Sequence, residues 1–181
     1  MSPAPSAHDD GAPSIAELVI FRVGSEEYAV DVRRVREVVA PLPVRRMPRV
    51  PEFMEGVADL RGEIIPVIDV RRRFGLHAGT PTRKTKLMVV HMGGSKVGLV
   101  VDAVLEVMRV SRAAIRPAPP LAGRDAPGLF LGVVGAHSGG RPGREGRSGL
   151  KFLLNVKGLL DPMASRDMEK ARALASKAAE P

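Results

Sequence analysis

Short apolar runs, most of them rich in valine, recur along this 181-residue chain and are separated by turns rich in glycine, proline and charged residues. β-Branched side chains favour strands, because they pack well on a pleated surface. Many short strands with Gly/Pro turns, in two similar halves, predict a mainly β fold of small barrels. We expect strands over 17–23, 28–32, both sides of a hairpin within 56–70, 86–92, 97–104, 105–110, 129–137 and 150–156.

The segment 31–39, DVRRVREVV, fits a helical period better than an alternating one. If Asp31 caps a short helix, the four valines fall on one side of it. A step of 100° per residue then places Glu37 on the opposite, outward side. We therefore predict a short amphipathic helix here.

Three further local signals concern turns and short helices. Residues 51–56 predict a helical turn that ends at Gly56, and Asp69 is expected to cap a brief helix over 70–74 that Gly75 ends. Ser111 is a candidate cap for a short turn. Pro66 lies inside the second strand of the 56–70 hairpin, so that strand is predicted to be an edge or to bulge there.

The two ends of the chain differ in composition from its centre. Residues 1–14 are rich in Pro, Ala, Ser and Asp, which predicts a disordered tail. Residues 161–181 favour a helix but carry a thin apolar face. We predict one domain over 15–160, whose two halves share strands or a core because each alone is small. The loop 138–149 is interpreted as an insertion, with a system-specific contact as the alternative.

Composition narrows the functional classes. The net charge of +8 is compatible with acidic partners, but the chain has five Phe, one Tyr and no Trp. Proteins that bind nucleic acid usually pair basic patches with stacking aromatics. A solvated basic rim, including Arg71–Arg73 and Arg141, Arg144 and Arg147, is therefore the favoured interpretation. A basic small-barrel nucleic-acid binder remains the alternative function.

The absence of cysteine excludes disulfides, thiol nucleophiles and cysteine-ligated metals. No apolar stretch has the length of a membrane-spanning helix, and the N-terminus lacks the features of a signal peptide. These features together predict a soluble cytoplasmic protein.

No group of residues suggests catalysis or a cofactor. The histidines lie far apart and at no metal-ligand spacing: His8, His77, His91 and His137. The segment GGSKVG (93–98) lacks the glycine spacing of a phosphate-binding loop, and a hairpin turn is the better interpretation. Capping or turn formation explains Asp69 and Asp102. We expect neither an enzyme nor a bound cofactor or metal.

Five blocks in register carry a family resemblance. The most specific is GVADLRGEIIPVIDV (56–70), supported by these: YAVDVRRVREVV (28–39), VGLVVDAVLEV (97–107), IRPAP (115–119) and LLNVKGLL (153–160). The sequence resembles CheW, the coupling-protein family of bacterial chemotaxis, from about Glu17 to Leu160. This resemblance implies two intertwined five-stranded SH3-like β-barrels.

The resemblance also implies a function and partners. It implies a non-catalytic cytoplasmic adaptor that binds the cytoplasmic tip of a chemoreceptor and the regulatory domain of a CheA-type histidine kinase. Because that kinase domain is itself CheW-like, the two can alternate in rings. A detached regulatory domain of a larger signalling protein is a third, lower-ranked interpretation.

The resemblance further assigns positions to these contacts. Arg61 matches an arginine in the groove between the lobes that influences both contacts, and Arg116 and Leu121 match positions that touch the kinase domain. Val35 and Glu37 match receptor-contact positions. The other positions match the same binding region as Arg61: Gly56, Lys86, Gly98 and Val107.

Several of these assignments have a structural alternative. Glu37 is also explained as a solvated carboxylate, the glycines as turn or close-packing positions, and Val107 as a core residue. From the sequence alone, Asp59 and Glu63 share the face of Arg61 in a regular strand. The sequence is compatible with two roles for Asp59: it holds the arginine side chain in place, or it only neutralises its charge.

Overall fold

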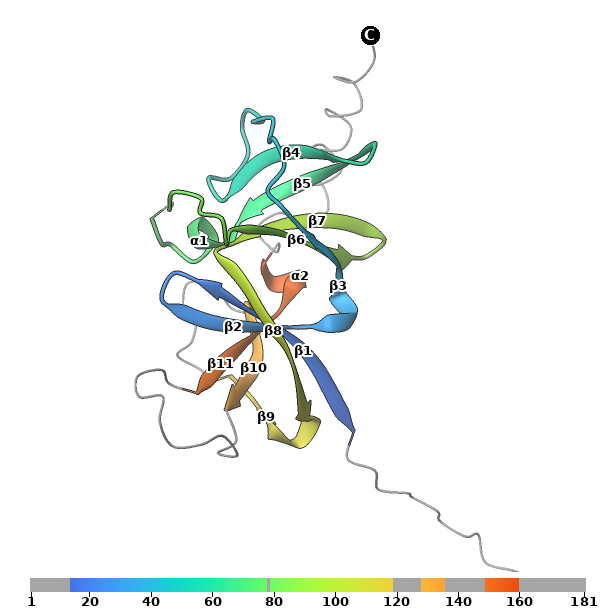
Figure 1. The fold of residues 1–181 in the computed structure, drawn as a ribbon, viewed down its shortest axis with the longest axis vertical. Helices are drawn as coiled ribbons and strands as arrows, with labels where there is room; N and C mark the ends of the chain where they lie inside the picture. The colour runs from blue at the N-terminus through green and yellow to red at the C-terminus, as the bar shows by residue number, and fades with distance from the viewer. Residues whose placement is uncertain (1–13, 78, 119–127, 136–148, 160–181) are drawn as a thin grey trace, which may run out of the picture.

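The computed structural model describes residues 14–77, 79–118, 128–135 and 149–159, and within them the fold is mainly β, as predicted. Two sheets define two lobes (Figure 1). Lobe one is the six-stranded sheet, with strands in this spatial order: β8 (Ala103–Ser111), β1 (Ile15–Val23), β2 (Glu26–Asp31), β11 (Leu150–Leu154), β10 (Phe130–Gly135) and the two-residue β9 (Ile115–Arg116).

Lobe two is the five-stranded sheet and is built from the middle of the chain. Its strands follow this spatial order: β3 (Val35–Val39), β6 (Lys86–Met92), β7 (Ser95–Val101), β5 (Glu63–Asp69) and β4 (Met54–Leu60). Within the described ranges, four short helical segments connect or flank the strands: η1 (Val32–Arg34), α1 (Val70–Arg73), η2 (Arg112–Ala114) and α2 (Val156–Leu159).

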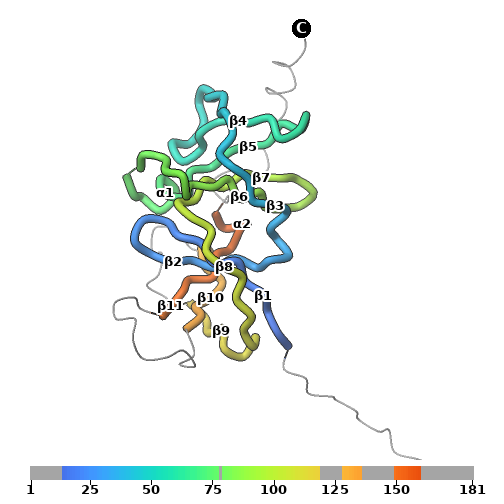
Figure 2. Tube along the Cα trace, in the orientation of Figure 1, coloured from blue at the N-terminus to red at the C-terminus, as the bar shows by residue number. Residues whose placement is uncertain are grey.

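The lobes are not successive halves of the sequence. Lobe one contains strands from both ends of the described chain, and lobe two lies between them in sequence. Figure 2 shows β1, in blue, beside β8, in yellow-green, and these strands pair antiparallel although all strands of lobe two separate them in sequence. This arrangement intertwines the lobes, as the resemblance implied.

One apolar core joins the two lobes. Phe21 and Tyr28 of lobe one pack in the same cluster as Met88 and Leu99 of lobe two. Each lobe also has a smaller cluster of its own, such as the one around Leu18 in lobe one. Because the largest cluster belongs to both sheets, neither lobe is expected to be stable alone.

The helix predicted over 31–39 is wrong beyond its first turn. Asp31 does cap a helical turn, because its side chain accepts a hydrogen bond from the Arg33 N–H at 2.9 Å. The chain then enters β3, which pairs with β6 and is bulged between Val35 and Glu37. Pairing with a strand about 50 residues away therefore overrides the local helical period.

Two predictions around the central hairpin also need correction. Residues 51–53 form a turn, but Gly56 lies inside β4 and ends no helix. Strand β5 is an interior strand, and no bulge lies at Pro66. Its pairing with β7 begins at Val67, so β7 requires no N–H from Pro66.

Other local predictions are confirmed. Asp69 caps α1 through its side chain, and Ser111 caps η2.

The predicted boundary between the strands 97–104 and 105–110 is wrong, because the boundary between β7 and β8 lies at Asp102. The predicted terminal tails, beyond Ser14 and Leu159, and almost all of the loop 138–149 lie outside the described residues, so the domain limits stay predictions.

The solvated rim predicted at Arg71–Arg73 is only partly present: Arg72 is exposed, but all three arginine side chains of α1 also make internal contacts. Arg71 binds Asp102, and Arg72 lies 3.4 Å from a carboxylate oxygen of Asp69. Arg73 donates to the carbonyl of Leu159 at 2.8 Å. Arginines 141, 144 and 147 lie outside the described residues.

Candidate functional site

Arg61 lies at the tip of the β4–β5 hairpin. Leu60 pairs with Glu63, which leaves a two-residue turn, and both Arg61 (φ 56°) and Gly62 (φ 85°) have positive φ. This geometry matches the twist of the flanking strands and explains Gly62, although arginine rarely adopts it. The side chain of Asp59 accepts a hydrogen bond from the Gly62 N–H at 2.6 Å. Asp59 therefore stabilises the turn and does not bind the arginine.

The partner of the Arg61 side chain is Glu37. The Arg61 Nη2 lies 2.8 Å from the Glu37 Oε2, across a sequence separation of 24 residues. The guanidinium side chain is 76% exposed and the carboxylate side chain 26%. An exposed pair of this kind contributes little to stability, so both groups are available to a partner at small cost.

Three of the predicted positions share one row across lobe two. Glu37 pairs with Val89, Val89 with Gly98, Gly98 with Val67, and Val67 with Gly56. This row crosses all five strands and starts at the Arg61–Glu37 pair. The register therefore connects residues that are far apart in the sequence.

The two glycines in this row are required for packing. Gly56 has φ 142°, and a Cβ there would lie 2.0 Å from the Arg45 carbonyl oxygen. The chain at Arg45 crosses close to β4 and exchanges two backbone hydrogen bonds with Val57. A Cβ on Gly98 would meet the Leu87 side chain at 2.8 Å. These contacts support close packing as one role of both glycines.

Three other predicted positions lie apart from the ion pair. Val35 pairs with Val90 and packs against the shared core, whereas Lys86 begins β6 and is half-buried. Val107 is on β8 of lobe one and is 58% exposed, so its interpretation as a core residue is wrong. An exposed valine on an edge strand is a candidate contact with a partner.

The predicted kinase-contact residues lie elsewhere. Arg116 is exposed on β9, which is at the opposite end of the lobe-one strand order from β8. Leu121 lies outside the described residues. In Figure 1, β9 lies at the bottom of the molecule and the β4–β5 hairpin that carries Arg61 lies at the top, so Arg116 and Arg61 are not brought together.

Sequence reasoning missed a second arginine–carboxylate contact, between the lobes. The Asp102 oxygens accept hydrogen bonds from the Arg71 Nε and Nη2, each at 2.7 Å, and one of them also accepts from the Gly24 N–H at 2.6 Å. This contact, which we call the interlobe latch, joins α1, the β7–β8 junction and the β1–β2 turn. No local pattern predicts it, because its members are 31 and 78 residues apart.

The remaining chemistry of the described residues is sparse. No three His, Asp or Glu side chains among them are placed to hold a metal ion, and no helix in this part of the chain is long and apolar enough to cross a membrane. Burial, and then the charge of Asp69, raise the pKa of Glu55. The side-chain hydrogen bond from Arg33 lowers the pKa of Asp31.

Comparison with known proteins gives consistent matches. The family model of the CheW-like domain matches residues 17–162. Chemotaxis protein CheW of Rhizobium meliloti (strain 1021) is 39% identical over 106 residues, which cover 59% of this chain and 68% of the relative. Protein FrzA of Myxococcus xanthus is 38% identical over 120 residues, which cover 66% of this chain and 74% of the relative.

The fold is also similar to a solved structure. The crystal structure of the scaffolding protein TtCheW from Thermoanaerobacter tengcongensis superimposes with a TM-score of 0.69 at 30% sequence identity. The match covers 82% of this chain and 94% of that protein. The similarity thus extends over both lobes.

Proposed function

This chain belongs to the CheW-like domain family, and from that premise we propose that it is a non-catalytic cytoplasmic adaptor of a bacterial chemosensory array. It binds the cytoplasmic tip of a chemoreceptor and the regulatory domain of a CheA-type histidine kinase. Receptor conformation then reaches the kinase through these contacts, without a chemical step on the adaptor.

The observation that carries this proposal is the exposed Arg61–Glu37 pair at the end of the row across lobe two. A hairpin with positive φ at both turn residues fixes the backbone at Arg61, and the contact with Glu37 orients its side chain. Arginine anchors contribute strongly to protein interfaces when a partner covers them. Charges around such an anchor adjust specificity and association rate.

The assignments to individual contacts are part of this proposal. Glu37, Val107 and Arg61 contact the receptor, and Arg61 also affects the kinase contact. Arg116 and Leu121 contact the kinase domain. The exposure of Arg116 is compatible with this assignment.

The placement of the aromatic residues disfavours nucleic-acid binding. Five of the six aromatic side chains form one chain of ring contacts within or against the shared core: Phe21, Tyr28, Phe74, Phe130 and Phe152. The sixth, Phe53, lies under the guanidinium of Arg73, with its ring centroid 5.2 Å from Cζ. The described residues therefore offer no exposed aromatic platform on which bases could stack.

The test uses the substitution Arg61→Glu in the full chain, with receptor and kinase identified by a pull-down from the native host. The variant should fold, because the side chain is exposed and its ion pair is weak. It should lose receptor-dependent kinase activation, measured as kinase autophosphorylation with and without receptor. Unchanged thermal unfolding would establish that the loss does not come from the fold.

The matched control is Arg83→Glu. Arg83 is an exposed arginine in the turn before β6, so the substitution changes the net charge equally at a distant place in the sequence. This control should activate the kinase as the wild type does. Normal activation by a folded Arg61→Glu variant would overturn the role of Arg61, and failure to recover any receptor or kinase would overturn the adaptor function.

A further inference from the structure

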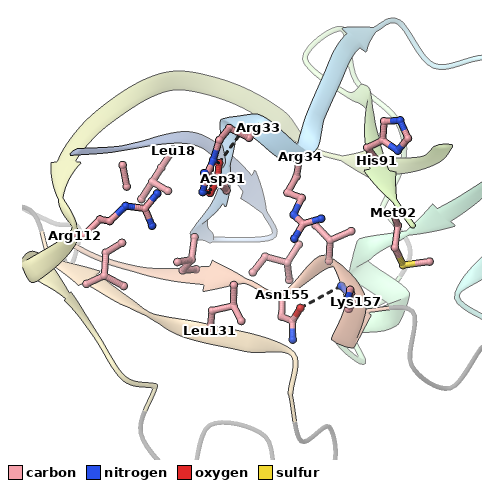
Figure 3. Close-up of a pocket in the computed structure, with 15 residues that line it drawn as sticks. Leu18, Asp31, Arg33, Arg34, His91, Met92, Arg112, Leu131, Asn155 and Lys157 are labelled. Carbon is pink, nitrogen blue, oxygen red and sulfur yellow. Dashed lines mark hydrogen bonds and ion pairs between the residues drawn. The ribbon is translucent and has the colours of Figure 1, made fainter. Parts of the chain in front are cut away.

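A cavity of about 720 Å³ opens mainly in lobe one, on residues that the proposed adaptor contacts do not use. Its walls come from β1, η1 and η2 on one side and from β10, β11 and α2 on the other, with the end of β6 at its rim (Figure 3). This volume is within the range of small-molecule sites in proteins.

The rim of the cavity carries an excess of positive charge. Arg34, Arg112 and Lys157 line it, and none of their side chains forms an ion pair with another described residue. Its one carboxylate, Asp31, is bound by Arg33 through contacts of 2.6–3.2 Å. In Figure 3, Arg112 and Arg34 reach toward the space from two sides of Leu131. Arg34 and Lys157 therefore have no described counter-charge, whereas Arg112, together with Arg33, contributes to the lowered pKa of Asp31.

Apolar side chains form part of the cavity lining beside these polar groups. Leu131 lines it and is 59% exposed, although it lies next to Gly132 in a strand whose following residues are buried. Leu18, Leu153 and Val156 form more of the lining. A bound molecule with an apolar body would cover Leu131 and remove that surface from water.

From this combination of volume, apolar lining and unpaired cations, we propose that the cavity binds a small amphiphilic oxyanion. The ligand has a carboxylate or phosphate head, which guanidinium groups bind with two parallel hydrogen bonds, and a hydrocarbon body that covers Leu131. The volume of the cavity is that of a site for one small molecule, which is why we propose a small ligand and not a folded partner. This site is independent of the adaptor function, so either can fail without the other.

The experiment titrates the full chain with octanoate and with octyl phosphate, by calorimetry and by amide chemical shifts. Saturable binding of one molecule per chain is expected, with shifts at Leu131, Leu153 and Arg34. The comparison of the two probes decides between a carboxylate and a phosphate head. Acetate, which has no hydrocarbon body, and octylammonium, which has the opposite charge, should bind much more weakly.

Matched variants test the geometry. Arg34→Ala should weaken octanoate binding about tenfold, since a hydrogen bond to a charged group is lost. Arg36→Ala should not, because Arg36 is also exposed, only two residues away, and does not line the cavity. Leu131→Glu should abolish binding without unfolding the chain, because the residue is exposed.

Three outcomes would overturn the proposal. The first is no saturable binding of either probe. The second is equal binding of acetate or octylammonium, which would mean that the body or the charge of the ligand is not recognised. The third is an equal effect of Arg34→Ala and Arg36→Ala, which would mean general attraction to a basic protein.

Discussion

Two arginines of this chain bind carboxylates at similar distances and yet have different roles. Arg71 makes two hydrogen bonds to Asp102, with side chains 29% and 24% exposed. Arg61 makes one to Glu37, and its side chain is 76% exposed. Burial and the number of contacts, more than the residue types, therefore separate a contact that holds the lobes together from one that a partner can use.

The surroundings of the two pairs strengthen this contrast. Asp102 also binds the Gly24 N–H, so it connects three segments of chain, and the hydrogen bond to Asp102 raises the pKa of Arg71. The Glu37 side chain has no second hydrogen bond to another described residue. A partner that displaces Glu37 from Arg61 would therefore leave the fold intact.

The largest expected effect is on the interlobe latch. Asp102→Ala removes three hydrogen bonds and leaves the half-buried Arg71 without its partner, which should lower the free energy of unfolding by about 2 kcal/mol. Urea unfolding followed by circular dichroism measures this change. Arg61→Ala is the control and should change stability by about 0.5 kcal/mol or less. Equal losses in the two variants would remove the distinction between the two arginines.

Local chemistry was enough to predict some elements of the fold. The Arg61–Gly62 hairpin and the caps at Asp69 and Ser111 depend on contacts within about four residues, which the sequence displays directly. Strand β3 was missed because the valines of 31–39 repeat at a helical period, whereas its state is decided by pairing with β6. Local preference could not reveal a strand whose partner is distant.

The candidate site, like the fold, could be predicted from the sequence only in part. The family resemblance selected Arg61, and the hairpin around it was predictable. Its partner was not, because Glu37 is 24 residues away while Asp59 and Glu63 are nearer in sequence. The latch and the cavity rim were hidden for a related reason: their arginines look like ordinary surface charges until the tertiary structure brings Asp102 or Leu131 next to them.

A third pair, Asp31–Arg33, should contribute less to stability than Arg71–Asp102 and more than Arg61–Glu37. Because the hydrogen bond from Arg33 lowers the pKa of Asp31 below its ordinary 3.8, the ionised carboxylate stabilises the folded state above that pH. This stabilisation is lost as the pH falls through the lowered pKa. Asp31→Asn should therefore cost stability at pH 7, by less than Asp102→Ala, and the cost should shrink below about pH 3.8. Urea unfolding of both proteins from pH 7 down to pH 3 measures it.

Asparagine is the informative substitution here, since its side-chain oxygen can still accept the Arg33 N–H that caps η1. A cost that stayed constant with pH would mean that the charge of Asp31 is not what stabilises the fold.

The smallest expected effect is the coupling between Glu37 and Arg61. A double-mutant cycle with Glu37→Gln, Arg61→Gln and the double variant should give a coupling free energy of about 0.5 kcal/mol or less, because one exposed hydrogen bond gains little over solvation by water. High salt should reduce it further. A coupling as large as the effect of Asp102→Ala would show that Arg61 is fixed as firmly as Arg71. Arg61 would then be a structural residue, and a partner that binds it would have to compensate for the lost coupling free energy with Glu37.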